Sequence, residues 1–339
     1  MKSRSVLLFF LLFAPLYLLG QLHSVKHFER ENGLSTASLL SLNESEDGYI
    51  WLGSDGYGLV RFDGDNFKYI NKSQKRENKH ITDIFINDKK LYFTTAYSGL
   101  FELKNDSVVK LNYIGTNERN QGVVCFENDM IVIQNVGIKI FHEGALVNEV
   151  TTYPFKTHTR YYGYHKFNDI LFVFTSKGSY FIQNRNIQSL SNWLGADLEL
   201  KNDIVGVIQT KGQLIFFSND LSFEYAVSFK RDGEKVVKYI PKTSPLEEGE
   251  LVLKWASRGG DFVLLTNKSG VFRRYKGNGD FHKVEHNFGK PLAKATGVLI
   301  DKNHDIWISS LREGAYRVSL EPFTQLKENE VLKDRKSVV

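Results

Sequence analysis

The sequence contains very little cysteine, methionine or proline. Cys125 is its only cysteine, which excludes a disulfide within the chain, so packing must stabilise the fold. The 339 residues include 6 Pro and 2 Met, against 25 Phe and 16 Tyr. Because aromatic side chains favour pleated strands, this bias indicates β-structure. With 42% hydrophobic residues, the chain is also too apolar to be disordered.

Long hydrophobic runs are missing after residue 20. The first twenty residues hold two basic residues, an apolar run over residues 6–19 that Pro15 interrupts, and Gly20. This order is typical of a secretory signal peptide, and the run falls short of the ~20 apolar residues of a membrane anchor. We expect residues 1–20 to be removed and the mature chain not to span a membrane. The expected location is periplasmic or secreted.

No charge of one sign dominates the rest of the chain. Removing Lys2 and Arg4 from the 44 basic residues leaves 42 against 39 acidic ones, a net charge of +3. Proteins that bind nucleic acid concentrate basic residues on one face, whereas here they are spread along the sequence. Nucleic acid is therefore not an expected partner.

Motifs for catalysis, phosphate binding and metal binding are missing too. The sequence has no Gly-rich phosphate loop, no G-x-S-x-G, no H-E-x-x-H and no cysteine pair. Cys125 lies in the apolar residues 123–126, which favours a small buried hydrophobe over a nucleophile. Asp301, Asn303 and Asp305 have the spacing that begins a calcium loop, but the required Gly and closing Glu are missing, which favours a plain turn. We expect no enzymatic activity, cofactor or metal in this chain.

What the sequence does contain is an internal repeat. Residues 47–54 read DGYIWLGS and lead into residues 58–62, GLVRF. Near the end, residues 303–310 read NHDIWISS and lead into residues 314–318, GAYRV. In both copies the Trp stands seven residues before the Gly, and weaker copies fill the interval. The anchors of the seven copies are Trp51, Tyr92, Val132, Phe172, Ile215, Val263 and Trp307.

The spacing of these anchors predicts the architecture. The steps are 41, 40, 40, 43, 48 and 44 residues, and one four-stranded propeller blade takes about 40–50. The short apolar runs lack the 3.6-residue period of helical repeats. We therefore predict an all-β fold, a seven-bladed β-propeller of four-stranded antiparallel blades over residues 21–326. The best helix candidate, residues 189–200, is otherwise a long loop between blades.

Certain repeat residues have predicted structural roles. The aromatic anchors would fill the space between adjacent blades, where truncating a buried Trp costs roughly 3–5 kcal/mol. The glycines would open the next strand where backbones approach closely. The residues with these roles are Trp51, Gly58, Tyr92, Gly99, Gly270, Trp307 and Gly314.

A propeller also needs a strand that closes its ring. Residues 24–28 (SVKHF) alternate like a strand and would complete the last blade, but residues 323–326 (FTQL) compete for the same place. Residues 327–339 are either a tail or the start of a further blade.

The repeat resembles a known family. Residues 31–35 (ENGLS), 47–54 and 58–64 (GLVRFDG) look like two-component regulator propeller repeats, closely at both ends of the chain and loosely between. In that family such repeats form the periplasmic sensor of membrane histidine kinases and hybrid regulators, commonly in Bacteroidetes-type bacteria. The resemblance implies a signal-input role, often linked to carbohydrate or nutrient sensing.

The resemblance also implies domains that this sequence does not contain. Members of the family continue through more propeller, an immunoglobulin-like domain, a transmembrane helix and a kinase or DNA-binding output. We expect either a truncated sensor, whose full-length homologue carries a histidine kinase output domain, or a short secreted protein.

The most site-like stretch is residues 156–166, KTHTRYYGYHK. It mixes aromatic faces with hydrogen-bond donors, as sugar and peptide sites do, although a strand with one buried face would have the same composition. The ligand-binding candidates are His158, Arg160, Tyr162 and Tyr164, the last three lining one mouth of the central channel.

These patterns favour an extracytoplasmic propeller that senses a ligand. Its expected partners are an unidentified extracellular solute, carbohydrate among the candidates, and an output domain or partner sensor protein. Two alternatives remain, a secreted propeller lyase or hydrolase acting on polysaccharide, and a scaffold propeller that binds another protein.

Overall fold

A computed structural model describes residues 24–70, 79–87, 89–111, 118–151, 159–195, 204–268, 270–274, 280–284 and 294–319. Within these ranges the strands form seven antiparallel sheets of four strands each. The predicted all-β fold and its seven four-stranded blades are thereby confirmed. The predicted signal peptide and the residues after 319 lie outside the described ranges.

Blades 1 to 3 follow one another along the chain. Blade 1 holds β2 (Leu39–Glu44), β3 (Ile50–Ser54), β4 (Leu59–Phe62) and β5 (Phe67–Tyr69). Blade 2 holds β6 (Ile81–Asn87), β7 (Lys90–Thr95), β8 (Gly99–Lys104) and β9 (Ser107–Leu111). Blade 3 holds β10 (Asn120–Phe126), β11 (Asp129–Gln134), β12 (Gly137–His142) and β13 (Ala145–Thr151).

Blades 4 to 7 complete the set. Blade 4 holds β14 (Tyr161–Phe167), β15 (Ile170–Thr175), β16 (Gly178–Gln183) and β17 (Asn186–Ser189). Blade 5 holds β18 (Ile204–Thr210), β19 (Gln213–Ser218), β20 (Phe223–Phe229) and β21 (Lys235–Pro241). Blade 6 holds β22 (Val252–Arg258), β23 (Asp261–Thr266), β24 (Val271–Arg274) and β25 (Phe281–Lys283). Blade 7 holds β26 (Ala295–Ile300), β27 (Ile306–Ser310), β28 (Ala315–Ser319) and β1 (Ser24–Phe28).

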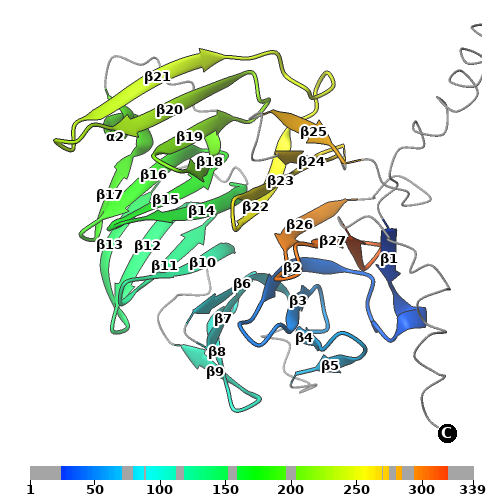
Figure 1. The fold of residues 1–339 in the computed structure, drawn as a ribbon. Coiled ribbons are helices and arrows are strands. Elements are labelled where there is room, and N and C mark those ends of the chain that lie inside the picture. The colour runs from blue at the N-terminus through cyan, green and yellow to red at the C-terminus, as the bar shows by residue number, and fades with distance from the viewer. Residues whose placement is uncertain are drawn as a thin grey trace, which may run out of the picture.

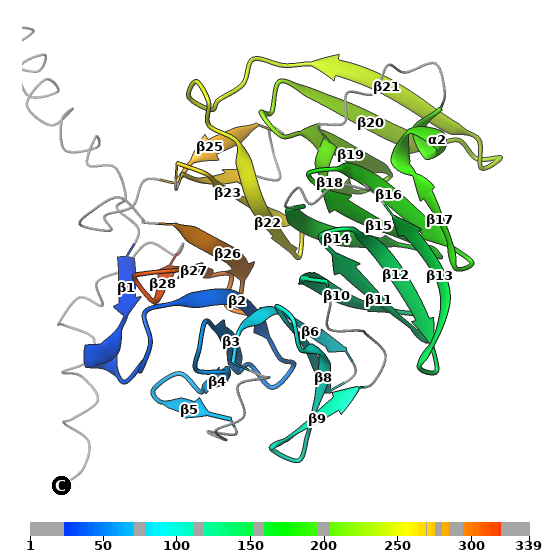
Figure 2. The ribbon, with the colours of Figure 1, turned by 180° about the vertical axis from the view of Figure 1, so that it is seen from behind.

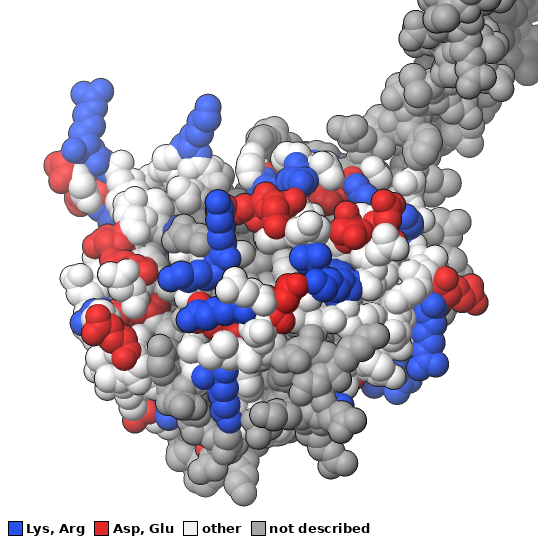
Figure 3. Space-filling view, turned by 90° about the horizontal axis from the view of Figure 1, so that it is seen from below, with Lys and Arg blue, Asp and Glu red and all other residues white. Residues whose placement is uncertain are grey.

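The seven sheets stand around a common axis, as both ribbon views show (Figures 1 and 2). The first strand of a blade lies nearest the axis, and the later strands lie progressively further out (Figure 1). Side chains of the first strands therefore line the centre of the ring. Basic and acidic side chains are interspersed on the side of the ring seen in Figure 3.

The sequence anchors all lie on the second strand of a blade. In six blades that strand ends on a hydroxyl residue, which braces the turn to the third strand. Ser54 Oγ donates a 2.7 Å hydrogen bond to the carbonyl of Gly58, and Thr175 Oγ1 does the same to Gly178. These hydroxyl side chains are at most 2% exposed, so each needs a partner inside the blade. The six residues are Ser54, Thr95, Thr175, Ser218, Thr266 and Ser310.

The N-terminal strand closes the ring. β1 pairs antiparallel with β28, in a register that sets Ser24 opposite Ser319 and Phe28 opposite Ala315. Of the two strands that the sequence offered, residues 24–28 therefore take the outer place in blade 7. Residues 323–326 lie outside the described ranges.

The core lies between adjacent blades. Trp307 is 2% exposed and packs with Phe28 and Phe62 between blades 7 and 1. Trp51 is 6% exposed and packs with Ile81 and Phe93 between blades 1 and 2. Five apolar clusters together cover the contacts between neighbouring blades, and they stabilise a fold that has no disulfide.

Helical structure is short. Of the helix candidate 189–200, α2 covers Leu190–Leu194, with Ser189 Oγ accepting a hydrogen bond from the amide of Ser191. A single 3₁₀ turn, η2, spans Arg30–Asn32. Across the part of the chain that is described, no helix has the length and apolar character needed to cross a membrane.

Candidate functional site

A cavity of about 430 Å³ occupies the centre of the ring. Its walls come from five of the seven inner strands, namely β2, β6, β14, β22 and β26. This is within the usual size range of small-molecule sites, about 300–1,000 Å³. The inner strands therefore carry the residues that decide what the channel holds.

All seven inner strands share a register shift near their start, and the third residue of each strand follows it. Gly or Ser fills this position in five blades, whereas blade 2 has Asp83 and blade 6 has Lys254. The residues are Ser41, Asp83, Gly122, Gly163, Gly206, Lys254 and Gly297.

Three of the four glycines at this position, Gly122, Gly163 and Gly206, make room for aromatic side chains. A Cβ at Gly122 would overlap the ring of Tyr161, and one at Gly163 would lie 3.2 Å from the indole of Trp255. Trp255 also donates a 2.9 Å hydrogen bond from Nε1 to the carbonyl of Val205 on β18. Trp255 thus extends from blade 6 across the inner strand of blade 5, and it forms part of the channel wall.

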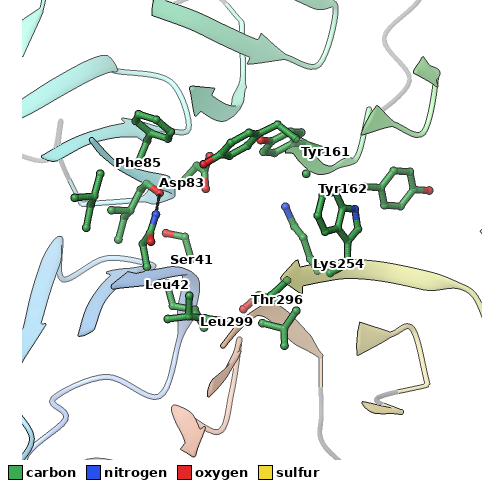
Figure 4. A pocket seen from close by; sticks show the side chains of 18 of the residues that line it. Ser41, Leu42, Asp83, Phe85, Tyr161, Tyr162, Lys254, Thr296 and Leu299 are labelled. Atoms are coloured by element: carbon green, nitrogen blue, oxygen red, sulfur yellow. Dashed lines mark hydrogen bonds between the residues drawn. The ribbon is translucent and has the colours of Figure 1, made fainter. Parts of the chain in front are cut away.

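Asp83 and Lys254 both project into the cavity, as Figure 4 shows. Asp83 Oδ2 accepts a 3.0 Å hydrogen bond from the amide of Val123. Desolvation within the ring raises the pKa of Asp83 from 3.8 to about 6, although the charge of Lys254 and the amide hydrogen bonds oppose the rise. The carboxyl group therefore titrates close to neutral pH.

Lys254 is the basic counterpart of Asp83. Its Nζ lies 4.5 Å from the centre of the Tyr161 ring, in a cation–π contact. Desolvation lowers the pKa of Lys254, the charge of Asp83 opposes that shift, and the charge of Arg160 adds to it. Two ionisable groups whose pKa values move toward neutrality thus share one cavity.

Two tyrosines complete this cluster. Burial raises the pKa of both Tyr161 and Tyr164, and the charge of Asp83 raises them further. Tyr161 is 4% exposed, and its Oη has no hydrogen-bond partner among the described residues. The hydroxyl itself is buried, whereas the residue as a whole borders the cavity.

The mouth at the start of the inner strands has a cavity of its own, of about 260 Å³. Of the ten described residues that line it, Arg119, Arg160 and Lys254 are basic and none is acidic. The Nε of Arg119 is buried and unpartnered among the described residues, whereas Arg160 is exposed. This mouth carries positive charge.

The far end of the channel has a different character. Arg258 forms a 2.7 Å ion pair with Glu44, joining the ends of β22 and β2. His165 lies 3.0 Å from Gln209 through Nε2, and burial lowers the pKa of His165 despite that hydrogen bond. Arg258 at this end thus has an acidic partner, whereas no described acidic residue lines the cavity at the other mouth.

The structure separates the ligand-binding candidates. Arg160 lies at the basic mouth and Tyr164 lines the channel. Tyr162 also borders the channel cavity, but it is 4% exposed and its ring points away from the cavity into the apolar core (Figure 4). His158 lies outside the described residues. The binding role of these four residues stays a prediction.

The repeat residues occupy turns and blade interfaces. Gly58, Gly99 and Gly314 have φ values of 80°, 104° and 72°, which side chains rarely adopt. Gly270 is instead crowded, because a Cβ there would lie 2.6 Å from Glu250 Oε1. Tyr92 is partly buried and packs against the apolar cluster of blades 2 to 4.

The structure also shows the contacts of two further features that the sequence analysis discussed, the 301–305 segment and Cys125. Asp301 Oδ1 accepts hydrogen bonds from the amides of Asn303 (2.8 Å) and Asp305 (3.0 Å), so this carboxylate braces a turn. Asp305 Oδ2 lies 2.5 Å from Nη2 of Arg317. Cys125 is half-buried rather than fully buried, since it lies on the wall of a second cavity between blades 2 and 3.

Asp83, Lys254 and Arg119 escaped the sequence analysis, whereas Tyr161 belongs to the site-like stretch 156–166 but was not among its named candidates. The available signal was a charged residue inside an apolar strand, as in residues 81–86 (ITDIFI) and 252–256 (VLKWA). Such a residue is costly in a blade interior unless it is paired, and a strand that faces a channel is one place where it is tolerated.

No protein-family model and no curated protein matches the chain. Solved structures do resemble it. One is the selenomethionine-substituted virginiamycin B lyase of Staphylococcus aureus, with a TM-score of 0.62, 12% identity and coverage of 88% of this chain and 100% of that one. Another is the WD40 propeller domain of Doa1, with a TM-score of 0.59, 14% identity and coverage of 89% and 97%.

The similar structures also include extracellular domains of proposed hybrid two-component systems from B. thetaiotaomicron. BT4673 has a TM-score of 0.63, 15% identity and coverage of 88% of this chain. BT3049 has a TM-score of 0.58, 14% identity and the same coverage. This chain spans 40% and 42% of those two domains. At such identities the likeness establishes a shared propeller fold, seen in sensor domains, in a lyase and in a WD40 protein alike.

Proposed function

We propose that this protein is an extracytoplasmic propeller that binds a small solute in its central channel and serves as the input part of a two-component regulator. The observation that carries the proposal is the pair Asp83 and Lys254. They occupy a strand position that is Gly or Ser in the other five blades, and they face one cavity. Convergent charged groups in a cavity lined by aromatic, aliphatic and small polar residues are the usual signature of a ligand site.

The residues that line the central cavity support this role. Tyr161, Tyr164 and Trp255 provide aromatic surface, and Asp83 and Thr296 provide hydrogen-bonding groups. Sugars and similar solutes are held by flat apolar contact combined with a few directional polar groups. A carbohydrate-like solute therefore fits the cavity.

The test is calorimetric titration with a panel of neutral and acidic sugars. We expect saturable binding to the wild type and at least tenfold weaker binding to the double variant Asp83→Asn/Lys254→Met. The matched control is Asp232→Asn/Lys211→Met, which changes the same residue types at exposed positions. Absence of binding across the panel, or unaltered binding to the channel variant, would contradict the proposal.

Export is the second part of the proposal. The N-terminal pattern supports cleavage near Gly20, and the periplasm or the exterior is the compartment in which an input domain meets its solute. N-terminal sequencing of the protein recovered from the periplasm tests it. An intact Met1 on the exported protein would overturn cleavage.

An enzymatic function is the alternative with a specific observation in its favour. Asp83 and Lys254 have pKa values displaced toward neutrality, as general acids and bases do. A polysaccharide lyase or hydrolase would use this pair for proton transfer. Measurable turnover of a glycan, abolished in Asp83→Asn, would replace the sensor proposal.

A scaffold function has a different basis. On the long hairpin of β20 and β21, Phe229, Val236 and Tyr239 are 40–50% exposed. β21 ends its sheet, and an open edge strand can pair with another chain. Co-purification of a protein that Tyr239→Asp releases, without solute binding in the channel, would favour this alternative.

A further inference from the structure

The inference concerns the basic mouth of the channel and rests on the proposed function. Three basic side chains, Arg119, Arg160 and Lys254, converge on a cavity of about 260 Å³ that has no acidic residue among its described lining. Arginine presents planar donors that match a carboxylate in a bidentate way. The mouth is therefore shaped and charged for an anionic group.

Unused hydrogen-bonding groups point to the same place. The Nε–H of Arg119 is buried, and no described residue accepts a hydrogen bond from it. The Oη of Tyr161 is likewise unpartnered, in a side chain that is 4% exposed and lines both cavities. Buried polar groups in native proteins nearly always have partners, so an oxygen of a ligand or of a bound water that reaches these two atoms would complete their hydrogen bonding.

Deeper in the channel the chemistry changes. Asp83 has one oxygen on the Val123 amide and lies in the same cavity as Lys254 and Tyr161 (Figure 4). A carboxylate there accepts hydrogen bonds from hydroxyl groups but repels a second anion. The channel thus has a positive outer end and a hydroxyl-accepting inner part.

We infer that the solute bound by this propeller is a hydroxylated carboxylate of the sugar-acid class, oriented with its carboxylate toward Arg119, Arg160 and Lys254 and its hydroxyls toward Asp83. Lys254 joins the two parts, because it lines both the mouth and the inner cavity. Neutral sugars lack the group that the mouth is built to hold.

The test compares galacturonate with galactose, which differ only at C6. Titration of the wild type is expected to give at least tenfold tighter binding of galacturonate, since one charge-assisted pair contributes about that factor. Arg160→Gln should remove most of this preference while leaving the fold intact, because Arg160 is exposed. Arg119→Gln should do the same, with its thermal melt as the check on folding. The control Arg231→Gln removes an exposed arginine from the β20–β21 turn and should change nothing.

The outcomes separate the two proposals. Equal affinity for galactose and galacturonate, or a galacturonate preference that survives both channel variants, overturns this inference and leaves solute binding standing. Binding of neutral sugars alone has the same consequence. Failure of every sugar and sugar acid in the panel to bind overturns both proposals.

Discussion

The ring of Phe28 stacks on the indole of Trp307, with ring centroids 5.3 Å apart and planes inclined by 12°. Phe28 belongs to the first described strand of the chain, and Trp307 to the last repeat. The contact sits where blade 7 meets blade 1, beside Phe62 and Phe67. Closure of the ring therefore depends on an aromatic cluster as well as on strand pairing.

Truncating this cluster should open the ring. Phe28 is 2% exposed, so Phe28→Ala is expected to destabilise the protein by about 3–5 kcal/mol. Urea denaturation followed by fluorescence measures the change. Tyr97→Ala is the control, because Tyr97 is an aromatic residue 56% exposed, and its truncation should alter stability by less than about 0.5 kcal/mol. Equal effects of the two substitutions would contradict the closing role of β1.

The last repeat should also depend on Asp301. Asp301 Oδ2 accepts a 2.8 Å hydrogen bond from Nε1 of Trp307, and its Oδ1 accepts two from backbone amides. Asp301→Ala leaves these buried donors without an acceptor and should destabilise the fold by at least about 2 kcal/mol. Ser45→Ala removes the equivalent acceptor of Trp51 in blade 1, at 3.1 Å, and should have a smaller effect. Equal unfolding midpoints for the wild type and Asp301→Ala would refute this assignment.

A methyl group at Gly122 should be poorly tolerated because of one neighbour. The added Cβ overlaps the Tyr161 ring, so Gly122→Ala should lose about 1–3 kcal/mol of unfolding free energy. Combining it with Tyr161→Ala should recover part of that loss in a double-mutant cycle. Gly212→Ala, at φ +95° with open space around it, serves as the comparison and should show no coupling to Tyr161→Ala. A zero coupling energy for the Gly122 pair would exclude the steric explanation.

Stability should depend on pH through Asp83. Its folded pKa, about 6, is above the ordinary 3.8, so ionisation opposes folding increasingly from pH 4 to pH 6 and by a constant amount above. The penalty is at most about 3 kcal/mol, from the 1.36 kcal/mol that one pKa unit represents. The facing groups are Lys254, Tyr161 and Tyr164, and the two tyrosines stay neutral across this range.

Asp83→Asn measures that penalty. The variant should match the wild type near pH 4 and exceed it in urea midpoint at pH 7.5. Asp65→Asn, in an exposed turn, should show no such divergence. A constant difference between Asp83→Asn and wild type from pH 4 to 7.5 would show that Asp83 is ionised throughout.

The blade count was predictable because each blade is a local unit. Residues 47–62 make two strands and a turn within sixteen residues, and the same pattern returns at 303–318 with its Trp and Gly in place. The residues in contact within a blade are close together in the sequence, so the period of the sequence repeat alone reveals the blades. Even the faint central copies, anchored on Val132 and Ile215, lie on second strands.

The site was less predictable, because residues far apart in the sequence form it. Tyr162 and Tyr164 stand two positions apart in one strand and would share a face under strict alternation, but the register shift at the start of β14 sends Tyr162 into the core. The shift arises from the way β14 pairs with β15, and the identity of a single residue does not predict it. Asp83 and Lys254 are 171 positions apart in the sequence and meet only because blades 2 and 6 face one channel.

By itself, the sequence determined that the chain builds seven four-stranded units and places Trp51 and Trp307 at equivalent positions. The physical reason is that the hydrophobic period, the turn residues and the repeat length are local properties of the sequence, and each is set within a single blade. Only the tertiary structure decided that β1 closes the ring and that Asp83, Lys254, Tyr161 and the mouth arginines share a cavity. Those relationships arise when the blades curve round a common axis, which brings the first strand to the last blade and the inner strands face to face.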